Sequence, residues 1–121
     1  MQLAGGMIFV KDFPRMRDFY RALLQAEPVN REWADVYAKF AQGQSTLALH
    51  AIPSEIAAGI AISDPPKPRE QAAVKLIFAV SDIDEARARL ESLGGAVVQR
   101  PWGDWDGVDP EGNVFGLSAV L

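Results

Sequence analysis

The only histidine of this chain, His50, is the side chain best suited to acid–base chemistry, because an unperturbed imidazole titrates close to neutral pH. Glu55 follows it closely, and a carboxyl group in apolar surroundings can have a raised pKa and act as a base. His50 and Glu55 are therefore the candidate catalytic residues. The alternatives are a hydrogen-bonding or pocket-lining histidine at a strand end and a solvated loop glutamate.

Four acids close to the C-terminal end suggest a calcium loop; they are Asp104, Asp106, Asp109 and Glu111. The EF-hand spacing, however, requires an oxygen donor where Val108 stands and a glutamate where Phe115 stands. Asp-Gly and Asp-Pro pairs are common in turns. The stretch therefore predicts turns, and we assign no metal ligand to it.

Aromatic and polar side chains of the kind that line small-molecule pockets form a third group. Arg100 could pair with a carboxylate or phosphate of a ligand through its fork of N–H donors, or with a local acid such as Asp104. The aromatic members could instead fill the core or a subunit interface. The candidate ligand-binding residues are Trp33, Tyr37, His50, Arg100, Trp102 and Trp105.

Composition limits the classes of function. The chain has 121 residues, of which 49% are hydrophobic and 23% charged, so one compact domain with a real core is expected. The net charge of −4 argues against nucleic-acid binding, which needs a basic surface. No stretch has the roughly 20 apolar residues of a membrane span, and no secretory leader is visible. We expect a cytoplasmic protein that contacts no membrane. The absence of cysteine excludes thiolate chemistry.

Two segments of the chain follow the same plan. Val10 and Val80, Asp12 and Asp82, and Leu23 and Leu93 are each 70 residues apart. In each segment an apolar strand leads to the aspartate, and an amphipathic helix follows it. The chain is therefore predicted to contain a duplicated supersecondary unit.

The remaining elements follow from turn and cap signals. Asp12 and Asp82 are N-cap residues for the two helices, and Gly94-Gly95 ends the second. Alternation predicts strands over 36–40 and 45–51, joined as a hairpin, and later strands over 96–99 and 113–118. A turn-rich stretch is predicted over 101–107. We divide the single domain 1–121 into a first module 1–52, a connector 53–72 and a second module 73–121.

This order of elements resembles the βαβββ module of the vicinal oxygen chelate superfamily, which includes glyoxalase I, the bleomycin-resistance proteins and the extradiol dioxygenases. The matching residues are Val10-x-Asp12 before Phe19-Tyr20, Val80-Ser81-Asp82 before Leu90 and Gly94-Gly95, and Asp109-Pro110-Glu111-Gly112-Asn113 before the last strand. The resemblance implies an α+β fold in which two βαβββ modules form a half-barrel that holds a ligand on its concave side.

The resemblance also places four metal-ligand positions, at Gly5, Ala48, Lys75 and Gly116. Glycine and alanine have no side-chain donor atom, and a lysine ammonium has no lone pair to offer. His50 lies two residues from Ala48, but a single imidazole cannot supply the three protein ligands of a typical catalytic site. We therefore expect no bound metal and no cofactor.

Three classes of function stay open. The first is a metal-free protein that binds an apolar or aromatic small molecule in the concave groove, and this is the one we favour. The second is a lyase, isomerase or dioxygenase with a displaced metal site or a His50/Glu55 acid–base pair. The third is a structural or regulatory protein whose groove is filled by its own side chains. The family resemblance and the exposed strand edges also predict a homodimer.

Overall fold

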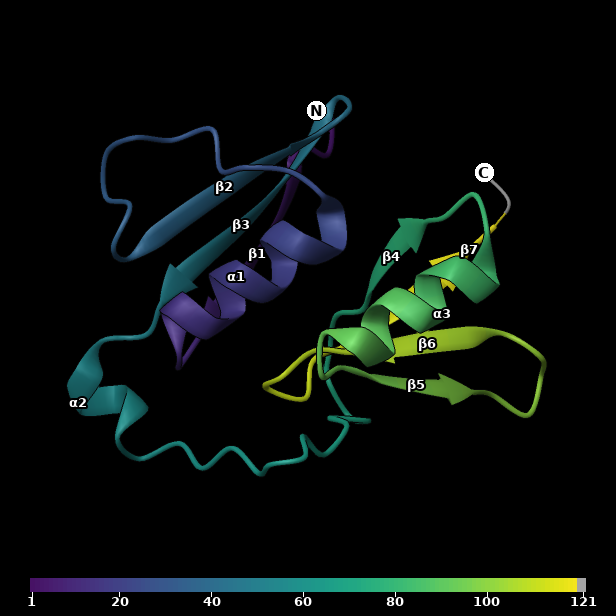
Figure 1. The fold of residues 1–121 in the computed structure, drawn as a ribbon. Helices are drawn as coiled ribbons and strands as arrows, with labels where there is room; N and C mark the ends of the chain where they lie inside the picture. The colour runs from purple at the N-terminus through teal and green to yellow at the C-terminus, as the bar shows by residue number, and fades with distance from the viewer. Residues whose placement is uncertain (120–121) are drawn as a thin grey trace. The chain divides into compact units, whose positions relative to one another are not determined.

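The computed structural model describes residues 1–119 and divides into two units, Met1–Ala61 and Ile62–Leu121. The first unit has the order β1 (Gly5–Val10), α1 (Phe13–Leu24), β2 (Tyr37–Gln42), β3 (Ser45–Ala51) and the short helix α2 (Ser54–Ala57). Its sheet has the strand order β1-β3-β2, with β1 parallel and β2 antiparallel to β3. Figure 1 shows α1 lying along one face of this sheet.

Helix α1 begins where the sequence predicts. The Asp12 carboxylate accepts a hydrogen bond from the Arg15 amide at 3.3 Å, and Pro14 occupies the first turn, where an N–H has no helical partner. Met16 and Tyr20, one turn apart on the same side of the helix, are fully buried. On the sheet, Val10 and Leu49 are buried as well, so the first core lies between α1 and one face of its sheet.

The first sheet has three strands where the βαβββ plan has four. The repeat places the missing strand at 26–29, in register with the strand at 96–99 of the second unit. Pro28 lies in this segment and cannot donate to a ladder. A single strand-like bond remains, from the Val29 amide to the Lys39 carbonyl at 2.8 Å.

The Asn30 side chain makes the hydrogen bonds to β2 that the backbone of a fourth strand would otherwise make. Its Oδ1 accepts a hydrogen bond from the Lys39 amide at 2.8 Å, and its Nδ2 donates to the Tyr37 carbonyl at 2.8 Å and to the Glu32 carbonyl at 2.9 Å. An amide side chain carries both a donor and an acceptor, so it can take the place of a peptide group beside β2. The edge of this sheet is therefore completed by a side chain.

Asn30→Ala is expected to destabilise the protein by about 1–2 kcal/mol, because backbone groups of β2 lose their partners. Urea unfolding followed by circular dichroism measures the change. The neighbouring variant Arg31→Ala removes an exposed side chain and should stay within about 0.5 kcal/mol of the wild type. Equal stability of the two variants would contradict this account of the sheet edge.

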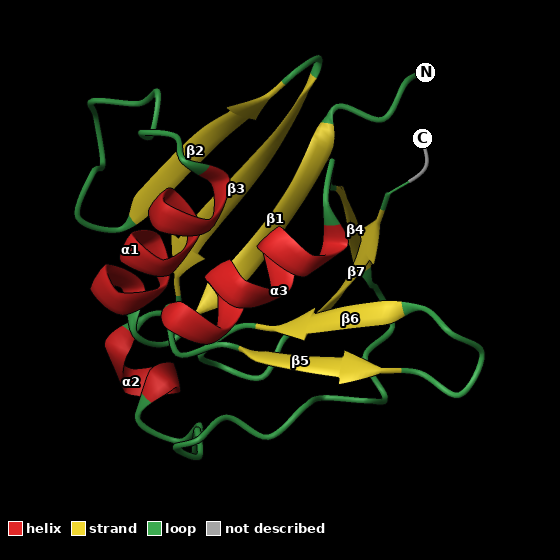
Figure 2. Ribbon diagram, turned by 45° about the vertical axis from the view of Figure 1, so that its right-hand side comes forward, coloured by secondary structure: helices red, strands yellow, loops and turns green. Residues whose placement is uncertain are grey.

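The second unit contains the complete module: β4 (Leu76–Ala79), α3 (Ile83–Ser92), β5 (Ala96–Gln99), β6 (Trp105–Val108) and β7 (Val114–Ser118). Its strand order is β4-β7-β6-β5, in which only β4 and β7 are parallel. Figure 2 shows α3 running along one face of these strands. The prediction of a turn-rich stretch over 101–107 is wrong in its last part, because β6 begins at Trp105. In the described residues no helix has the length and apolar character needed to span a membrane.

Helix α3 also begins at its predicted cap. The Asp82 carboxylate accepts hydrogen bonds from the amides of Asp84 at 2.9 Å and Glu85 at 3.1 Å. The helix ends before Gly94, which has a positive φ of 79°, as a glycine stop signal predicts. On the inner side of α3, Leu90 is fully buried. The α+β class and the duplicated plan are therefore confirmed.

Candidate functional site

Alternation along the strands decides which residues of the second sheet lie on the face opposite α3, which we call the helix-distal face. A Cβ atom on Gly107 would lie 2.9 Å from Cδ1 of Leu90 on α3, so Gly107 is on the helix side. Its neighbour Asp106 must then lie on the helix-distal face. Asp106 pairs with Gly116 of β7, which pairs with Ile77 of β4, so these three residues form one row across that face.

A charged network is centred on Asp106. The side chain of Asp106 is 1% exposed, and Nζ of Lys75 lies 2.8 Å from its Oδ1 and 2.9 Å from its Oδ2. Nε of Arg100 donates to Oδ2 at 2.6 Å. The Arg100 guanidinium also pairs with Glu70, at 3.1 Å. Two cations thus hold one buried carboxylate, and a second acid balances the charge.

The protonation of Asp106 follows from these contacts. Burial alone would raise the pKa of the carboxyl group, because it disfavours the charged form. The hydrogen bonds and charges of Lys75 and Arg100 outweigh burial, so the pKa of Asp106 lies below its ordinary value. The hydrogen bond to Asp106 is also the main cause of the raised pKa of Arg100. Asp106 and Arg100 are therefore both charged at neutral pH.

The first sheet carries an aromatic row on its own helix-distal face. Phe9, His50 and Tyr37 occupy the same register position on β1, β3 and β2. The His50 ring lies 5.8 Å from the Phe9 ring and 6.3 Å from the Tyr37 ring, measured between centroids. His50 Nδ1 is 2.8 Å from the Ala51 carbonyl oxygen, which only accepts, so Nδ1 carries a proton. In the neutral ring Nε2 is then the acceptor.

A profile of the glyoxalase-like domain family matches residues 7–118, which is nearly the whole chain. The chain belongs to this glyoxalase-like family. The match confirms the resemblance to the vicinal oxygen chelate superfamily that the sequence repeat and its short motifs indicate. Comparison with curated protein sequences gave no match.

Solved structures with the same fold include several from this superfamily. The fosfomycin resistance protein FosX from Listeria monocytogenes has a TM-score of 0.73 at 17% identity, over 99% of this chain and 91% of that one. FosX from Mesorhizobium loti gives 0.70 at 18% identity, over 99% and 92%. Lactoylglutathione lyase from Agrobacterium tumefaciens gives 0.59 at 22% identity, over 96% and 91%. At these identities the likeness establishes the fold.

The metal positions that the family resemblance implies do not fit a metal in either unit. A Cβ atom on Gly5 would collide with the Thr46 carbonyl oxygen and lie 2.7 Å from its Oγ1, so β3 itself occupies the space a ligand side chain would need. In the second unit the Lys75 ammonium is committed to Asp106. Within the described residues of either unit, no three His, Asp or Glu side chains are grouped as a metal site.

The predicted site residues are divided between the two units, with Trp33, Tyr37, His50 and Glu55 in the first and Arg100, Trp102 and Trp105 in the second. Tyr37 and His50 lie side by side, as described above. Glu55 is exposed on α2, and its one hydrogen bond among the described residues comes from the Ser54 hydroxyl. Trp33 and Trp102 are exposed in loops. The structure thus gives no support to a His50/Glu55 acid–base pair.

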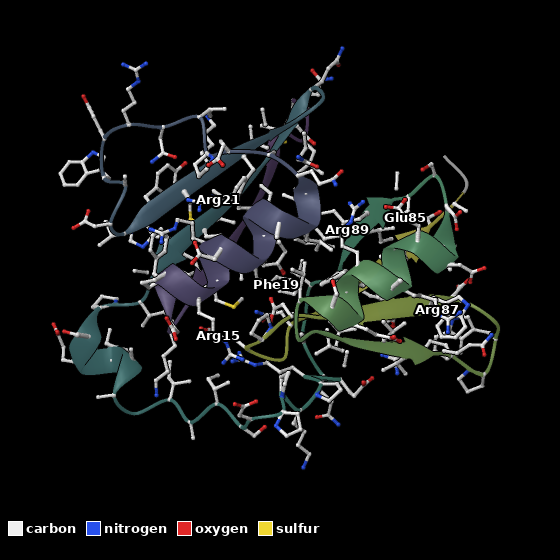
Figure 3. All side chains as sticks on the ribbon, viewed as in Figure 1. Arg15, Phe19, Arg21, Glu85, Arg87 and Arg89 are labelled. Atoms are coloured by element: carbon white, nitrogen blue, oxygen red, sulfur yellow. The ribbon has the colours of Figure 1, made fainter. Side chains whose placement is uncertain are left out.

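Trp105 and Arg100 have surroundings that differ from those predicted. Trp105 lies on the helix side of β6, where the Arg87 guanidinium of α3 covers its ring at 3.7 Å from the centroid. Figure 3 shows Arg87 projecting from α3 toward the β5–β6 hairpin. This cation–π contact makes Trp105 part of the packing between α3 and its sheet. Arg100 pairs with Asp106 and Glu70, and Asp104 contributes only its backbone carbonyl, which accepts from the Arg100 amide.

The prediction of turns for the acid-rich stretch near the C-terminus is confirmed around Asp109 and wrong at Asp106, which lies in β6. Oδ1 of Asp109 accepts hydrogen bonds from the amides of Glu111 at 2.9 Å and Asn113 at 3.0 Å, and Oδ2 accepts from Asn113 Nδ2 at 2.8 Å. This carboxylate therefore organises the backbone before β7. The residue that sequence reasoning missed is Asp106. The pattern that indicates its role is its spacing from Val108, which is buried two residues later. In a strand this spacing places Asp106 and Val108 on the same face of the sheet.

Proposed function

We propose that this member of the glyoxalase-like family binds a small organic molecule without the divalent metal of its metal-dependent relatives. The observation that carries the proposal is the Lys75 ammonium, 2.8 Å from the buried Asp106 carboxylate at a position where a metal ligand would be expected. A positive charge held there by the protein opposes the binding of a second cation. The glycine and alanine at the other positions add no donor.

The ligand contacts we propose on the first unit are apolar and aromatic. Phe9 and Tyr37 flank His50 on the helix-distal face, and Phe9 is exposed. Flat rings with one polar edge suit the recognition of an apolar or aromatic molecule. His50 supplies Nε2 as a hydrogen-bonding group beside these rings. Trp33, exposed in a loop of the same unit, is proposed as an additional contact.

Metal analysis tests this proposal. Protein made without a histidine tag is incubated with manganese, zinc, nickel and ferrous ions in turn, desalted, and measured by plasma mass spectrometry. We expect essentially no bound metal in the wild type and in His50→Ala, because a lone imidazole is a weak site. Stoichiometric metal in the wild type that disappears in His50→Ala would contradict the proposal and support the alternative, an enzyme with a displaced metal site.

Ligand binding is tested separately by tryptophan fluorescence. A library of aromatic compounds and antibiotics is titrated against the wild type and Tyr37→Ala, with the exposed Arg31→Ala as the matched control. Compounds that act through the aromatic row should lose affinity in Tyr37→Ala and keep it in Arg31→Ala. A wild type that responds to no compound would count against small-molecule binding. We also propose the cytoplasmic homodimer predicted from the sequence.

A further inference from the structure

Lys75, Gly116 and Ile77 form a small amphipathic patch on the helix-distal face of the second sheet. A Cβ atom on Gly116 would lie 3.4 Å from Ile77 Cγ1 and 3.6 Å from Lys75 Cε. Gly116 itself is buried, and the Ile77 side chain and the Lys75 stem that cover it form the surface of the patch. Ile77 is 70% exposed, although it lies in a strand of the sheet. A molecule placed on this patch would touch both an apolar and a cationic side chain.

The Lys75 ammonium can serve a ligand as well as Asp106. An ammonium has three N–H donors, and the two Asp106 oxygens at 2.8 Å and 2.9 Å can take only two of them when each accepts one. The Lys75 side chain is 45% exposed, whereas that of Arg100 is 14% exposed. Asp106 thus fixes the ammonium in place on a side chain that stays partly exposed. Such a preorganised donor loses little freedom when it binds an acceptor.

We propose that Lys75 binds the carboxylate of a small organic acid whose apolar part rests on Ile77. This deepens the proposed metal-free binding and rests on it. A carboxylate is favoured over a neutral carbonyl because charge-assisted hydrogen bonds are about twice as strong. It is favoured over a phosphate dianion because the network holds two acids, Asp106 and Glu70, beside its two cations. These acids repel a dianion more strongly than a carboxylate monoanion.

Benzoate is the probe, and benzamide is its neutral counterpart of the same shape. Each is titrated to about 20 mM, a range suited to a weak fragment, against the full chain labelled with ¹⁵N. We expect benzoate to shift the amide signals of Gly116 and Ile77 with saturation, and benzamide to bind about tenfold more weakly. Equal binding of the two compounds would overturn the role of the carboxylate and leave metal-free binding standing.

Four variants separate the charge of Lys75 from its structural role. Lys75→Met removes the charge and should weaken benzoate binding about tenfold or more, whereas Lys75→Arg keeps the charge and should bind. Lys67→Met, the same change at an exposed lysine of the same unit, should bind like the wild type. Ile77→Glu alters only an exposed side chain, so it should fold, and its negative charge should repel benzoate.

Two further results would overturn the inference. One is benzoate binding of unchanged affinity in both Lys75→Met and Ile77→Glu, and the other is no saturable shift at Gly116 in the wild type. A failure of the metal-free proposal gives a different result, namely metal retained in the mass-spectrometry experiment. Raising the salt concentration should weaken benzoate binding in the wild type, because the contact between the carboxylate and the Lys75 ammonium is electrostatic.

Discussion

Replacing Asp106 with asparagine is expected to lower the free energy of unfolding by about 3 kcal/mol, because it removes one partner of a buried ion pair. Arg100, largely buried, would keep only Glu70 as its acidic partner. The cost falls at the lower end of the usual range because the Lys75 side chain is half-exposed and can turn toward water. Asparagine preserves the volume of aspartate, so no cavity contributes to the loss.

Urea unfolding at several pH values measures this effect. The folded pKa of Asp106 is lowered, so its ion pairs stabilise the protein at pH values above the unfolded pKa of about 3.9. This stabilisation is lost as the pH falls through the folded pKa. The difference between the wild type and Asp106→Asn should therefore be full near neutral pH and shrink in acid.

Asp104→Asn is the matched control for this prediction. Asp104 is exposed in the turn before β6, and its contact with Arg100 is made by the backbone carbonyl, which the substitution keeps. Its stability should stay within about 0.5 kcal/mol of the wild type. A constant difference between wild type and Asp106→Asn down to strong acid would show that the loss does not arise from the carboxylate charge.

The sequence predicts those features that depend on neighbours in the chain. Asp12 and Asp82 cap helices because their side chains reach amides two or three residues ahead, and no distant contact is needed. The hairpin of β2 and β3 follows from alternation on both sides of Gly43, which has a positive φ of 61°. The repeat at a spacing of 70 residues predicts that the two modules share the same order of elements. Local chemistry therefore accounts for most elements.

The features that could not be predicted depend on pairing between distant segments. Asn30 completes a sheet edge only because β2 lies beside it, and its residue type alone indicates a turn. Trp105 lies under Arg87 because β6 begins at that residue, inside the stretch over 101–107 that was predicted to form turns. Asp106 gains its partners from 31 residues and 6 residues away. A single sequence shows the residues of such networks, but it does not show the strand register that brings them together.

Gly107 is a second place where a distant contact decides the residue type. It lies on β6 beneath α3, and a Cβ atom there would collide with the Phe115 ring and lie 2.9 Å from Leu90 Cδ1. Phe115 and Leu90 are both buried, so neither can turn toward solvent to make room. The Phe78 ring packs edge-on against Phe115 at 5.1 Å and limits its movement further. The absence of a side chain lets the helix approach the sheet closely.

Gly107→Ala is therefore expected to destabilise the protein by about 2–3 kcal/mol, the upper part of the range for overpacking a tight core. Gly59→Ala is the control, because the nearest atom to its added Cβ is the Ile56 carbonyl oxygen at an ordinary 3.6 Å. Alanine has less freedom than glycine in the unfolded chain, so the control should keep or slightly raise stability. Thermal and urea unfolding compare the two. The added methyl group faces α3, whereas Asp106 faces the opposite side of the sheet, so Gly107→Ala should leave the pH dependence of stability unchanged. If Gly107→Ala lost this pH dependence as Asp106→Asn does, the strain would lie in the ion network and not in the core.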